Sequence, residues 1–147
     1  MSDSLVIKAP GTAKEFEQYY HLRWLLLRAP WQQPAGSEKD ELENESIHRI
    51  ALLNNIIVGV GRIHFINKDK AQVRYMAVTK DFERRGIGQA ILDSLEQAAK
   101  RNNRKTLILQ AREDAVGFYT KQGYKTLKPS HLLFNEIQHF EMAKHLI

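Results

Sequence analysis

The sequence predicts a mixed α/β fold in which a mainly antiparallel central sheet is flanked by helices. Three observations predict it. Strand-like runs between residues 47 and 79 are joined only by short polar turns. A strongly periodic helix is expected over residues 86–102, and shorter strands alternate with one more helix towards the C-terminus. The 147 residues are the length of one ordinary domain, so we expect a single domain over 1–147.

The N-terminal half is expected to begin with a short strand over 5–7 and a helix that Thr12 opens. Glu15 stands three residues after Thr12, which is the spacing of a capping box. Apolar residues then recur at helical spacing up to the Ala29-Pro30 pair, which ends the helix: Phe16, Tyr20, Trp24 and Leu27. Three strands follow and form an antiparallel meander, at 47–53, 56–66 and 73–78.

The C-terminal half is expected to begin with the helix over 86–102. Its apolar stripe consists of Ile87, Ile91, Leu95 and Ala98. A strand at 106–109 leads to a short helix at 115–119, which Gly123 would terminate. Two closing strands are expected at 123–127 and 137–142.

Composition excludes several classes of site. The chain has no cysteine, which rules out disulfides, thiolate zinc sites, cysteine nucleophiles and iron–sulfur clusters. None of the six histidines has metal-ligand spacing, so no metal is expected. The N-terminus does not resemble a secretory signal, and the longest apolar runs are too short to span a membrane. We therefore expect a cytoplasmic protein with no membrane partner.

Charge is distributed unevenly along a chain whose net charge is +5. Residues 80–105 are mainly basic, whereas residues 37–45 are mainly acidic. A basic excess is compatible with an anionic ligand or a nucleic acid. The sequence lacks helix-turn-helix, zinc-finger, RRM and KH signatures, and its aromatic residues are not interleaved with the basic run. We therefore expect no nucleic-acid partner.

The most informative segment joins the strand at 73–78 to the helix at 86–102. It contains the run Arg84-Arg85-Gly86-Ile87-Gly88-Gln89. The first N–H groups of a helix have no intrahelical partners and lie at the positive end of its dipole. A glycine-rich turn at this position therefore predicts an anion site. It is neither a P-loop nor a dinucleotide fingerprint, because no Lys-Ser/Thr pair follows Gly88 and position 91 is not glycine.

This turn and a second block resemble the GNAT acetyltransferase superfamily. Glu83-Arg84-Arg85-Gly86-Ile87-Gly88 is similar to its pyrophosphate motif, with Glu83 in place of the usual Gln or Arg. Phe118-Tyr119-Thr120-Lys121-Gln122-Gly123-Tyr124 matches its second block, although Arg112 stands where the family often has Asn. The segments 27–31, 72–78 and 137–142 look like the small bacterial ElaA-like subgroup. The resemblance spans nearly the whole chain and implies the GNAT-type acyl-CoA acyltransferase fold.

The resemblance also implies an activity: acetyl-CoA would be the cosubstrate, and a primary amine would attack its thioester directly in a ternary complex. In this family the strand before the turn splays from its neighbour, which here leaves backbone groups of Met76, Ala77 and Val78 free to bind pantetheine and polarise the thioester. Tyr119 matches the tyrosine that protonates the leaving sulfur, and Lys121 would reach an outer phosphate. The remaining implied contacts to coenzyme A are Arg84, Arg85, Gly86, Ile87, Gly88, Gln89 and Phe118.

The acceptor side is less defined. By strand alternation Arg62 and His64 share one face, and so do Arg74 and Met76. By analogy with the fold, residues 28–45 lie over the acceptor cleft. Their acids (Glu38, Asp40, Glu41, Glu43 and Glu45) form either a rim for a cationic amine or an exposed polar segment. Glu45 and His139 are the candidate bases, whereas His64 is interpreted first as a half-buried structural histidine. Acceptor contacts are expected from Arg28, Trp31, Arg62, Arg74 and His139.

Two readings of the function remain open at this stage. The first is an N-acetyltransferase whose acceptor is a small molecule, a protein lysine or an N-terminus. The second is a non-catalytic acyl-CoA-binding sensor or interaction module of the same fold. The resemblance also implies a homodimer, since dimers are common in the superfamily.

Overall fold

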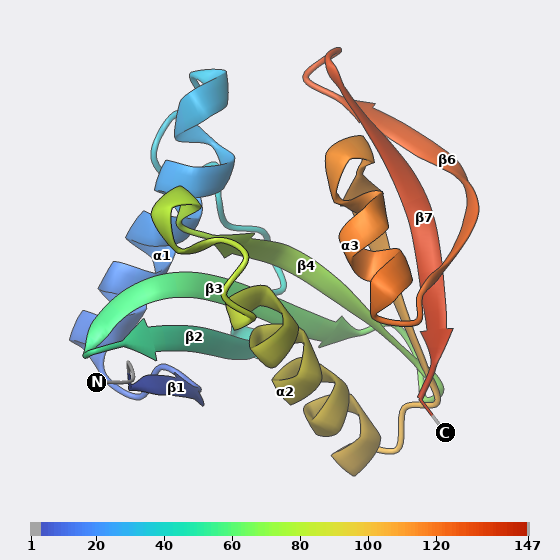
Figure 1. The fold of residues 1–147 in the computed structure, drawn as a ribbon, viewed down its shortest axis with the longest axis horizontal. Helices are drawn as coiled ribbons and strands as arrows, with labels where there is room; N and C mark the ends of the chain where they lie inside the picture. The colour runs from blue at the N-terminus through green and yellow to red at the C-terminus, as the bar shows by residue number, and fades with distance from the viewer. Residues whose placement is uncertain (1–3, 147) are drawn as a thin grey trace.

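The computed structural model describes residues 4–146, which form a seven-stranded sheet with helices on both faces (Figure 1). The strands follow the order β1-β2-β3-β4-β5-β7-β6. They are β1 (Leu5–Lys8), β2 (Ile47–Leu53), β3 (Ile56–Phe65), β4 (Lys70–Val78), β5 (Thr106–Arg112), β6 (Lys125–Leu133) and β7 (Ile137–His145). The helices are α1 (Ala13–Leu27), α2 (Ile87–Arg101) and α3 (Val116–Lys121). The N-terminal residues 1–3, on which the expected lack of a secretory signal rests, lie outside the described residues.

The expected fold class is confirmed. Strands β2, β3 and β4 form the antiparallel meander, and only β4 and β5 pair in parallel. The capping box is also present, since Thr12 Oγ1 accepts the Glu15 N–H at 3.0 Å. Strand β6 runs well beyond its expected end at residue 127. Nearly all of its side chains are exposed at the sheet edge, so its sequence shows no apolar alternation that would reveal its length.

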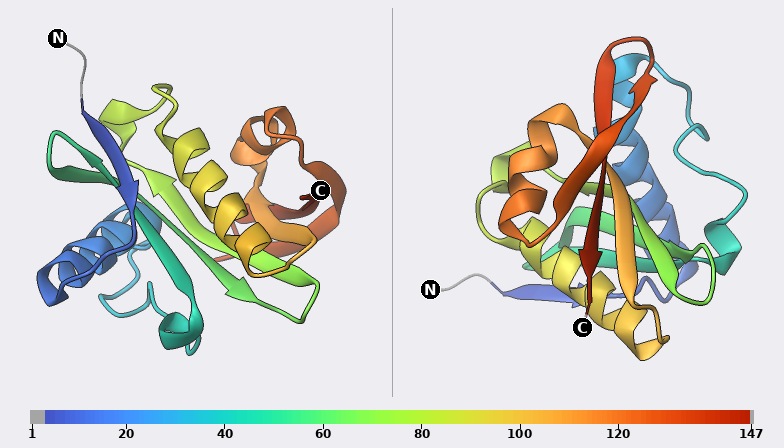
Figure 2. Two further views of the ribbon diagram at one scale, coloured as in Figure 1. Left: turned by 90° about the horizontal axis from the view of Figure 1, so that it is seen from below. Right: turned by 90° about the vertical axis from the view of Figure 1, so that its right-hand side faces the viewer.

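Helices α1 and α2 lie on opposite faces of the sheet (Figure 2). The expected stripe of α2 is buried: Ile87, Ile91, Leu95 and Ala98. Glycines on β3 allow this helix to approach closely, because a Cβ atom at Gly61 would lie 2.7 Å from Ile91 Cγ2. The main apolar core therefore lies between α2 and the sheet.

Helix α1 has the expected length, but its most buried side chains are not those of the apolar stripe expected from the sequence. Its fully buried side chains are Tyr19 and Arg23, whereas Phe16, Tyr20 and Trp24 are only partly buried. The sheet face beneath α1 is mixed: Tyr19 packs against the buried Ile50 and Val60, and its hydroxyl finds a polar partner on the sheet. The Tyr19 hydroxyl lies 2.7 Å from Nδ1 of His48 on β2, and Arg23 Nη2 donates to the same hydroxyl at 2.6 Å.

Two irregularities in β4 shape the sheet next to the glycine turn. Parallel pairing with β5 ends at Val73↔Leu109, although β4 continues to Val78, so the two strands separate as the family resemblance implied. The pairing with β3 also shifts, from Arg62↔Arg74 to Val60↔Ala77, which is a β-bulge.

The bulge corrects one expectation. Tyr75 has a positive φ of 58°, which breaks the strand alternation. Arg74 and Met76 were expected to share a face. Instead, Arg74 lies on the α1 side, where it pairs with Asp40, and Met76 packs into the α2 core. Sequence alternation could not reveal this because a bulge adds a residue to one strand only.

Candidate active site

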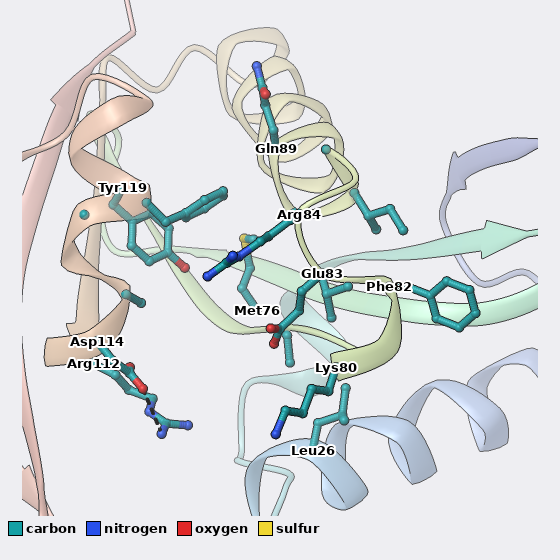
Figure 3. Close-up of a pocket in the computed structure, with 18 of the residues that line it drawn as sticks. Leu26, Met76, Lys80, Phe82, Glu83, Arg84, Gln89, Arg112, Asp114 and Tyr119 are labelled. Carbon is teal, nitrogen blue, oxygen red and sulfur yellow. Dashed lines mark ion pairs between the residues drawn. The ribbon is translucent and has the colours of Figure 1, made fainter. Parts of the chain in front are cut away.

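A cavity of about 1000 Å³ lies between the end of β4, the start of α2, α3 and the end of α1 (Figure 3). It is lined by backbone and side chains of all four elements and of the turn before α2. The lining residues that carry the argument below are Met76, Ala77, Val78, Arg84, Gly86, Ile87, Gly88, Gln89, Phe118 and Tyr119. Most of the coenzyme contacts implied by the sequence resemblance therefore lie in one cavity.

The start of α2 has the features of an anion site. Gly86 is the N-cap residue, with φ of 79°, and no side chain caps the helix. The first N–H groups of α2 are consequently left for a ligand. A Cβ atom at Gly88 would lie 3.4 Å from Phe118 Cζ on α3, which is an ordinary van der Waals distance. Gly86 is therefore the glycine that the backbone of the turn favours, because its φ is positive.

The cavity lining is basic. It includes the four cationic side chains of Lys80, Arg84, Arg112 and Lys121 and the two carboxylates of Glu83 and Asp114. Only Arg112 has an acidic partner within the lining, since its Nη2 lies 3.5 Å from Asp114 Oδ2. Arg85, which was expected beside the phosphates, lies outside the lining with its guanidinium 5.2 Å from the centre of the Phe82 ring.

Tyr119 extends from α3 with its hydroxyl pointing into the cavity (Figure 3). Its ring packs edge-on against Phe118 and Tyr124, with centroids 5.0 Å and 5.8 Å away. Burial raises the pKa of the Tyr119 hydroxyl well above its usual range. The phenol therefore keeps its proton at neutral pH and can donate a hydrogen bond.

The end of β4 forms the cavity wall facing Tyr119. Met76, Ala77 and Val78 line the cavity, and they lie beyond the last residue pair that joins β4 to β5. Their backbone groups on that side are thus available to a ligand. Backbone donors at a splayed strand edge are well suited to bind an amide-containing chain or a developing oxyanion.

The two candidate bases lie in different environments. Neither Glu45 nor His139 is part of the cavity lining. Glu45 is exposed in the short turn η2 (Glu43–Glu45). His139 is buried in β7, directly opposite Arg112 in register. Its Nδ1 lies 3.0 Å from the Ile137 carbonyl oxygen, and its ring stacks on His131 with centroids 4.2 Å apart.

Burial lowers the pKa of His139, and the neighbouring His131 and Arg112 lower it further against the opposing hydrogen bond to Ile137. The ring is therefore neutral at neutral pH. Because Nδ1–H donates to a carbonyl, Nε2 carries the free lone pair. His64 is part-buried, and its Nδ1 accepts from Arg62 Nη2 at 3.1 Å. Arg62 and His64 therefore lie on the same face of β3, as strand alternation predicted.

The acids of the 37–45 segment do not form an open rim. Asp40 accepts from Arg62 and Arg74, while Glu43 accepts from Arg23 and Arg62. Glu38 is buried and accepts the Gly36 N–H at 2.7 Å. Neither alternative drawn from the sequence, a rim for a cationic amine or an exposed polar segment, describes these three acids, because Glu38 is buried and arginines already bind Asp40 and Glu43.

Four of the five expected acceptor residues gather on the α1 side of the sheet, and the fifth, His139, is on β7 opposite Arg112. Arg62 and Arg74 are opposite one another on β3 and β4. Trp31 lies beside the tip of the β6–β7 hairpin, with its ring 6.3 Å from that of Phe134. Arg28 follows α1 directly and faces the rings of Tyr75 and Phe134. Sequence reasoning missed Tyr75, because no local signal marks the bulge that places it there.

Comparisons with known proteins agree with this geometry. A family model described as an acetyltransferase (GNAT) domain matches residues 31–146. The uncharacterized N-acetyltransferase YjcF of Bacillus subtilis is 36% identical over 111 residues, which cover 76% of this chain and 79% of that protein. The fold is similar to that of an aminoglycoside 6'-N-acetyltransferase complexed with coenzyme A, with a TM-score of 0.81, 17% identity and 97% of each chain covered. It is also similar to Escherichia coli ElaA, with a TM-score of 0.77, 14% identity, and coverage of 98% of this chain and 100% of ElaA. No helix between residues 4 and 146 is long and apolar enough to cross a membrane.

Proposed function

The chain belongs to the GNAT acetyltransferase family, and from this premise we propose that it is an acetyl-CoA-dependent N-acetyltransferase. It transfers the acetyl group to a primary amine by direct attack in a ternary complex. One observation carries the proposal: a single cavity contains an uncapped helix start, a splayed strand edge and a protonated tyrosine. The coenzyme A complex of a similarly folded acetyltransferase supports the choice of donor.

In this proposal the basic turn holds the donor. The pyrophosphate lies at the N–H groups of α2, next to Gly86 and Gly88, while Arg84 and Lys121 contribute positive charge. The pantetheine arm then runs along the free edge of β4 as an added strand would. This places the thioester between the edge of β4 and Tyr119, which line the same cavity.

Acetyl transfer makes a C–N bond and breaks the C–S bond of the thioester. Backbone N–H groups at Met76–Val78 stabilise the negative charge that develops on the carbonyl oxygen. Tyr119 is protonated and donates a hydrogen bond to the departing sulfur, which stabilises the charge that develops there as the C–S bond breaks and assists its protonation. The amine must lose a proton, and we assign this role to the neutral Nε2 of His139 acting through water. Neither residue lines the cavity, and Glu45 is the weaker candidate because it is exposed whereas His139 is buried.

The donor site is tested by titrating acetyl-CoA into the protein in a calorimeter. Arg84→Glu reverses one charge in the cavity lining and is expected to weaken binding by about tenfold or more. Arg101→Glu, a matched change at the exposed far end of α2, should leave the affinity unchanged. Equal affinities for all three proteins would contradict the placement of the donor.

Turnover is tested separately, by measuring the free thiol released from acetyl-CoA in the presence of amines. Thiol release that depends on an amine supports the enzyme. Micromolar binding of acetyl-CoA without transfer to any amine would instead favour the alternative, a non-catalytic acyl-CoA sensor. The titration tests where acetyl-CoA binds, and the thiol assay tests whether the bound acetyl group is transferred. Together they distinguish a misplaced donor site from a correctly placed donor site in a protein that does not catalyse transfer.

A further inference from the structure

The bulge residue Tyr75 is surrounded by arginines. Four guanidinium carbons lie within 6 Å of the centre of its ring: Arg23 at 4.2 Å, Arg74 at 4.5 Å, Arg62 at 4.9 Å and Arg28 at 5.6 Å. Each contact is a favourable cation–π geometry. An aromatic face does not neutralise four positive charges, however, so the charge balance depends on nearby carboxylates.

The carboxylates in contact with this cluster are too few. Asp40 and Glu43 accept from Arg23, Arg62 and Arg74, and Asp40 serves both Arg62 and Arg74. Among residues 4–146, no carboxylate forms an ion pair with Arg28. Its Nε donates to the Ser37 carbonyl at 3.1 Å and its Nη1 to the Leu27 carbonyl at 3.2 Å. The cluster thus holds four cations and two anions.

Arg28 and Arg74 are the two arginines of the cluster whose charge is least balanced by carboxylates, and they are also the two that solvent can reach. Arg23 and Arg62 are fully buried, whereas the side chain of Arg74 is 43% exposed and Arg28 is part-buried. Burial lowers the pKa of Arg28; the neighbouring Tyr75 hydroxyl opposes this shift, and the charges of Arg74 and Arg23 add to it. A part-buried guanidinium beside like charges is stabilised by an added anion.

We propose that Arg28 and Arg74 bind a carboxylate of the acceptor, so that the acceptor is a small amine bearing a carboxylate rather than a polycation. This inference rests on the proposed function, because it concerns the acceptor of that reaction. Arginine pairs with a carboxylate through two parallel hydrogen bonds, which fixes orientation as well as position. Of the two arginines, only Arg74 already pairs with a carboxylate, that of Asp40, and Asp40 also binds Arg62.

The position of the cluster suits an acceptor of short reach. Tyr75 immediately precedes Met76, so the arginines surround the residue next to the proposed thioester edge. Leu25, Leu26 and Pro30 line the donor cavity and flank Arg28 in the chain. Arg28, Arg74 and Tyr75 do not themselves line the donor cavity, so the proposed acceptor reaches from the arginines to the strand edge, with a few atoms between its carboxylate and its amine.

The experiment compares matched acceptors. Each protein amino acid and β-alanine is compared with its own carboxamide, and 1,3-diaminopropane represents the cationic acceptors. Binding to the CoA-saturated protein is measured by calorimetry, and transfer is measured by release of free thiol from acetyl-CoA. At least one carboxylate should be preferred over its carboxamide by about 10- to 100-fold, in Kd and in KM.

Variants locate the site. Arg28→Gln and Arg74→Gln should each remove most of the preference, and Arg28→Lys should retain part of it. Arg101→Gln, an exposed arginine on α2, should behave as the parent. All variants should bind acetyl-CoA with parental affinity, which also shows that they are folded.

The outcomes separate the two proposals. Carboxylate binding that depends on Arg28, without thiol release, supports the anion site and contradicts the enzymatic function. Thiol release with carboxamides or diaminopropane as good as the carboxylates supports the function and overturns the acceptor class. A carboxylate preference unchanged in both glutamine variants overturns the assignment of the site, and no binding of any compound overturns the inference altogether.

Discussion

Arg62 donates to both oxygens of Asp40: Nη1 lies 2.7 Å from Oδ1 and Nη2 lies 2.9 Å from Oδ2. This two-pronged pair joins β3 to the segment between α1 and β2. The same guanidinium reaches Glu43 Oε2 at 2.8 Å. The 28–45 segment, which was expected to cover the acceptor side, is therefore held against the sheet by buried ion pairs to Asp40 and Glu43. Its position should be sensitive to single substitutions in these pairs.

Glu43→Gln should be strongly destabilising. Glu43 Oε2 accepts from the fully buried Arg23 and Arg62 and from the Asp40 N–H at 3.1 Å. Removing one partner of a buried charge pair leaves an uncompensated charge and costs about 3–5 kcal/mol. Urea unfolding should show this loss, whereas Glu45→Gln, an exposed neighbour, should change stability by less than about 0.5 kcal/mol. Equal effects of the two changes would contradict the network.

The Asp40 pair also predicts a pH dependence of stability. Burial raises the pKa of Asp40, but the hydrogen bonds from Arg62 and the Leu42 N–H and the charges of Arg62 and Arg74 outweigh it and hold the pKa well below its usual range. Asp40 therefore contributes stability above its unfolded pKa of about 3.9, and this contribution is lost as the pH falls towards the folded pKa.

Asp40→Asn should accordingly be less stable than the parent at pH 7. The difference between the two proteins should shrink as the pH is lowered from about 5 to about 2. Urea midpoints measured across this range test the prediction. A constant difference at all pH values would show that the Asp40 charge is not coupled to folding.

Tyr119→Phe should separate chemistry from binding. Losing the proton donor should lower kcat by about 100-fold or more, while acetyl-CoA affinity changes little. Tyr124→Phe is the matched control, because its hydroxyl donates to the buried Glu96 Oε2 at 2.9 Å. That change should lower stability by about 1–3 kcal/mol and leave kcat near the parental value. A parental kcat in Tyr119→Phe would exclude the tyrosine as the acid.

The sequence predicted well those features that depend on local pattern. The Thr12–Glu15 cap, the buried stripe of α2 and the glycine turn at Gly86 all follow from residues close together in the chain. Each has a physical cause that acts within a few residues: capping, helical periodicity or a positive φ. The same is true of the end of α3, where Gly123 has a φ of 96°.

Features that depend on contacts across the chain were not predictable in this way. Glu43 points towards the sheet and Glu45 points to solvent because the buried Arg23 and Arg62 lie where they pair with Glu43. The burial of Tyr19 in α1 depends on His48 of β2, which lies among the apolar Ile50 and Val60, and helical spacing alone does not reveal this. The bulge at Tyr75 reversed the expected face of Met76, and it created the arginine cluster on which the acceptor inference depends.

Gly61→Ala tests whether the approach of α2 to the sheet is as close as the structure indicates. A new Cβ atom would lie 2.7 Å from Ile91 Cγ2, 3.1 Å from Leu95 Cδ1 and 3.2 Å from Met76 Cγ. Overpacking of this kind costs about 1–3 kcal/mol. The displaced Met76 also belongs to the cavity wall, so acetyl-CoA affinity should fall together with the urea midpoint.

Gly117→Ala is the matched control for overpacking. Gly117 is exposed in α3, and a Cβ atom there would have no neighbour within 4 Å. Alanine favours the helix over glycine, so stability without ligand should rise by up to about 1 kcal/mol. If both substitutions stabilised the protein, α2 would lie farther from β3 than the structure places it, and the wall formed by Met76 would have to be reconsidered.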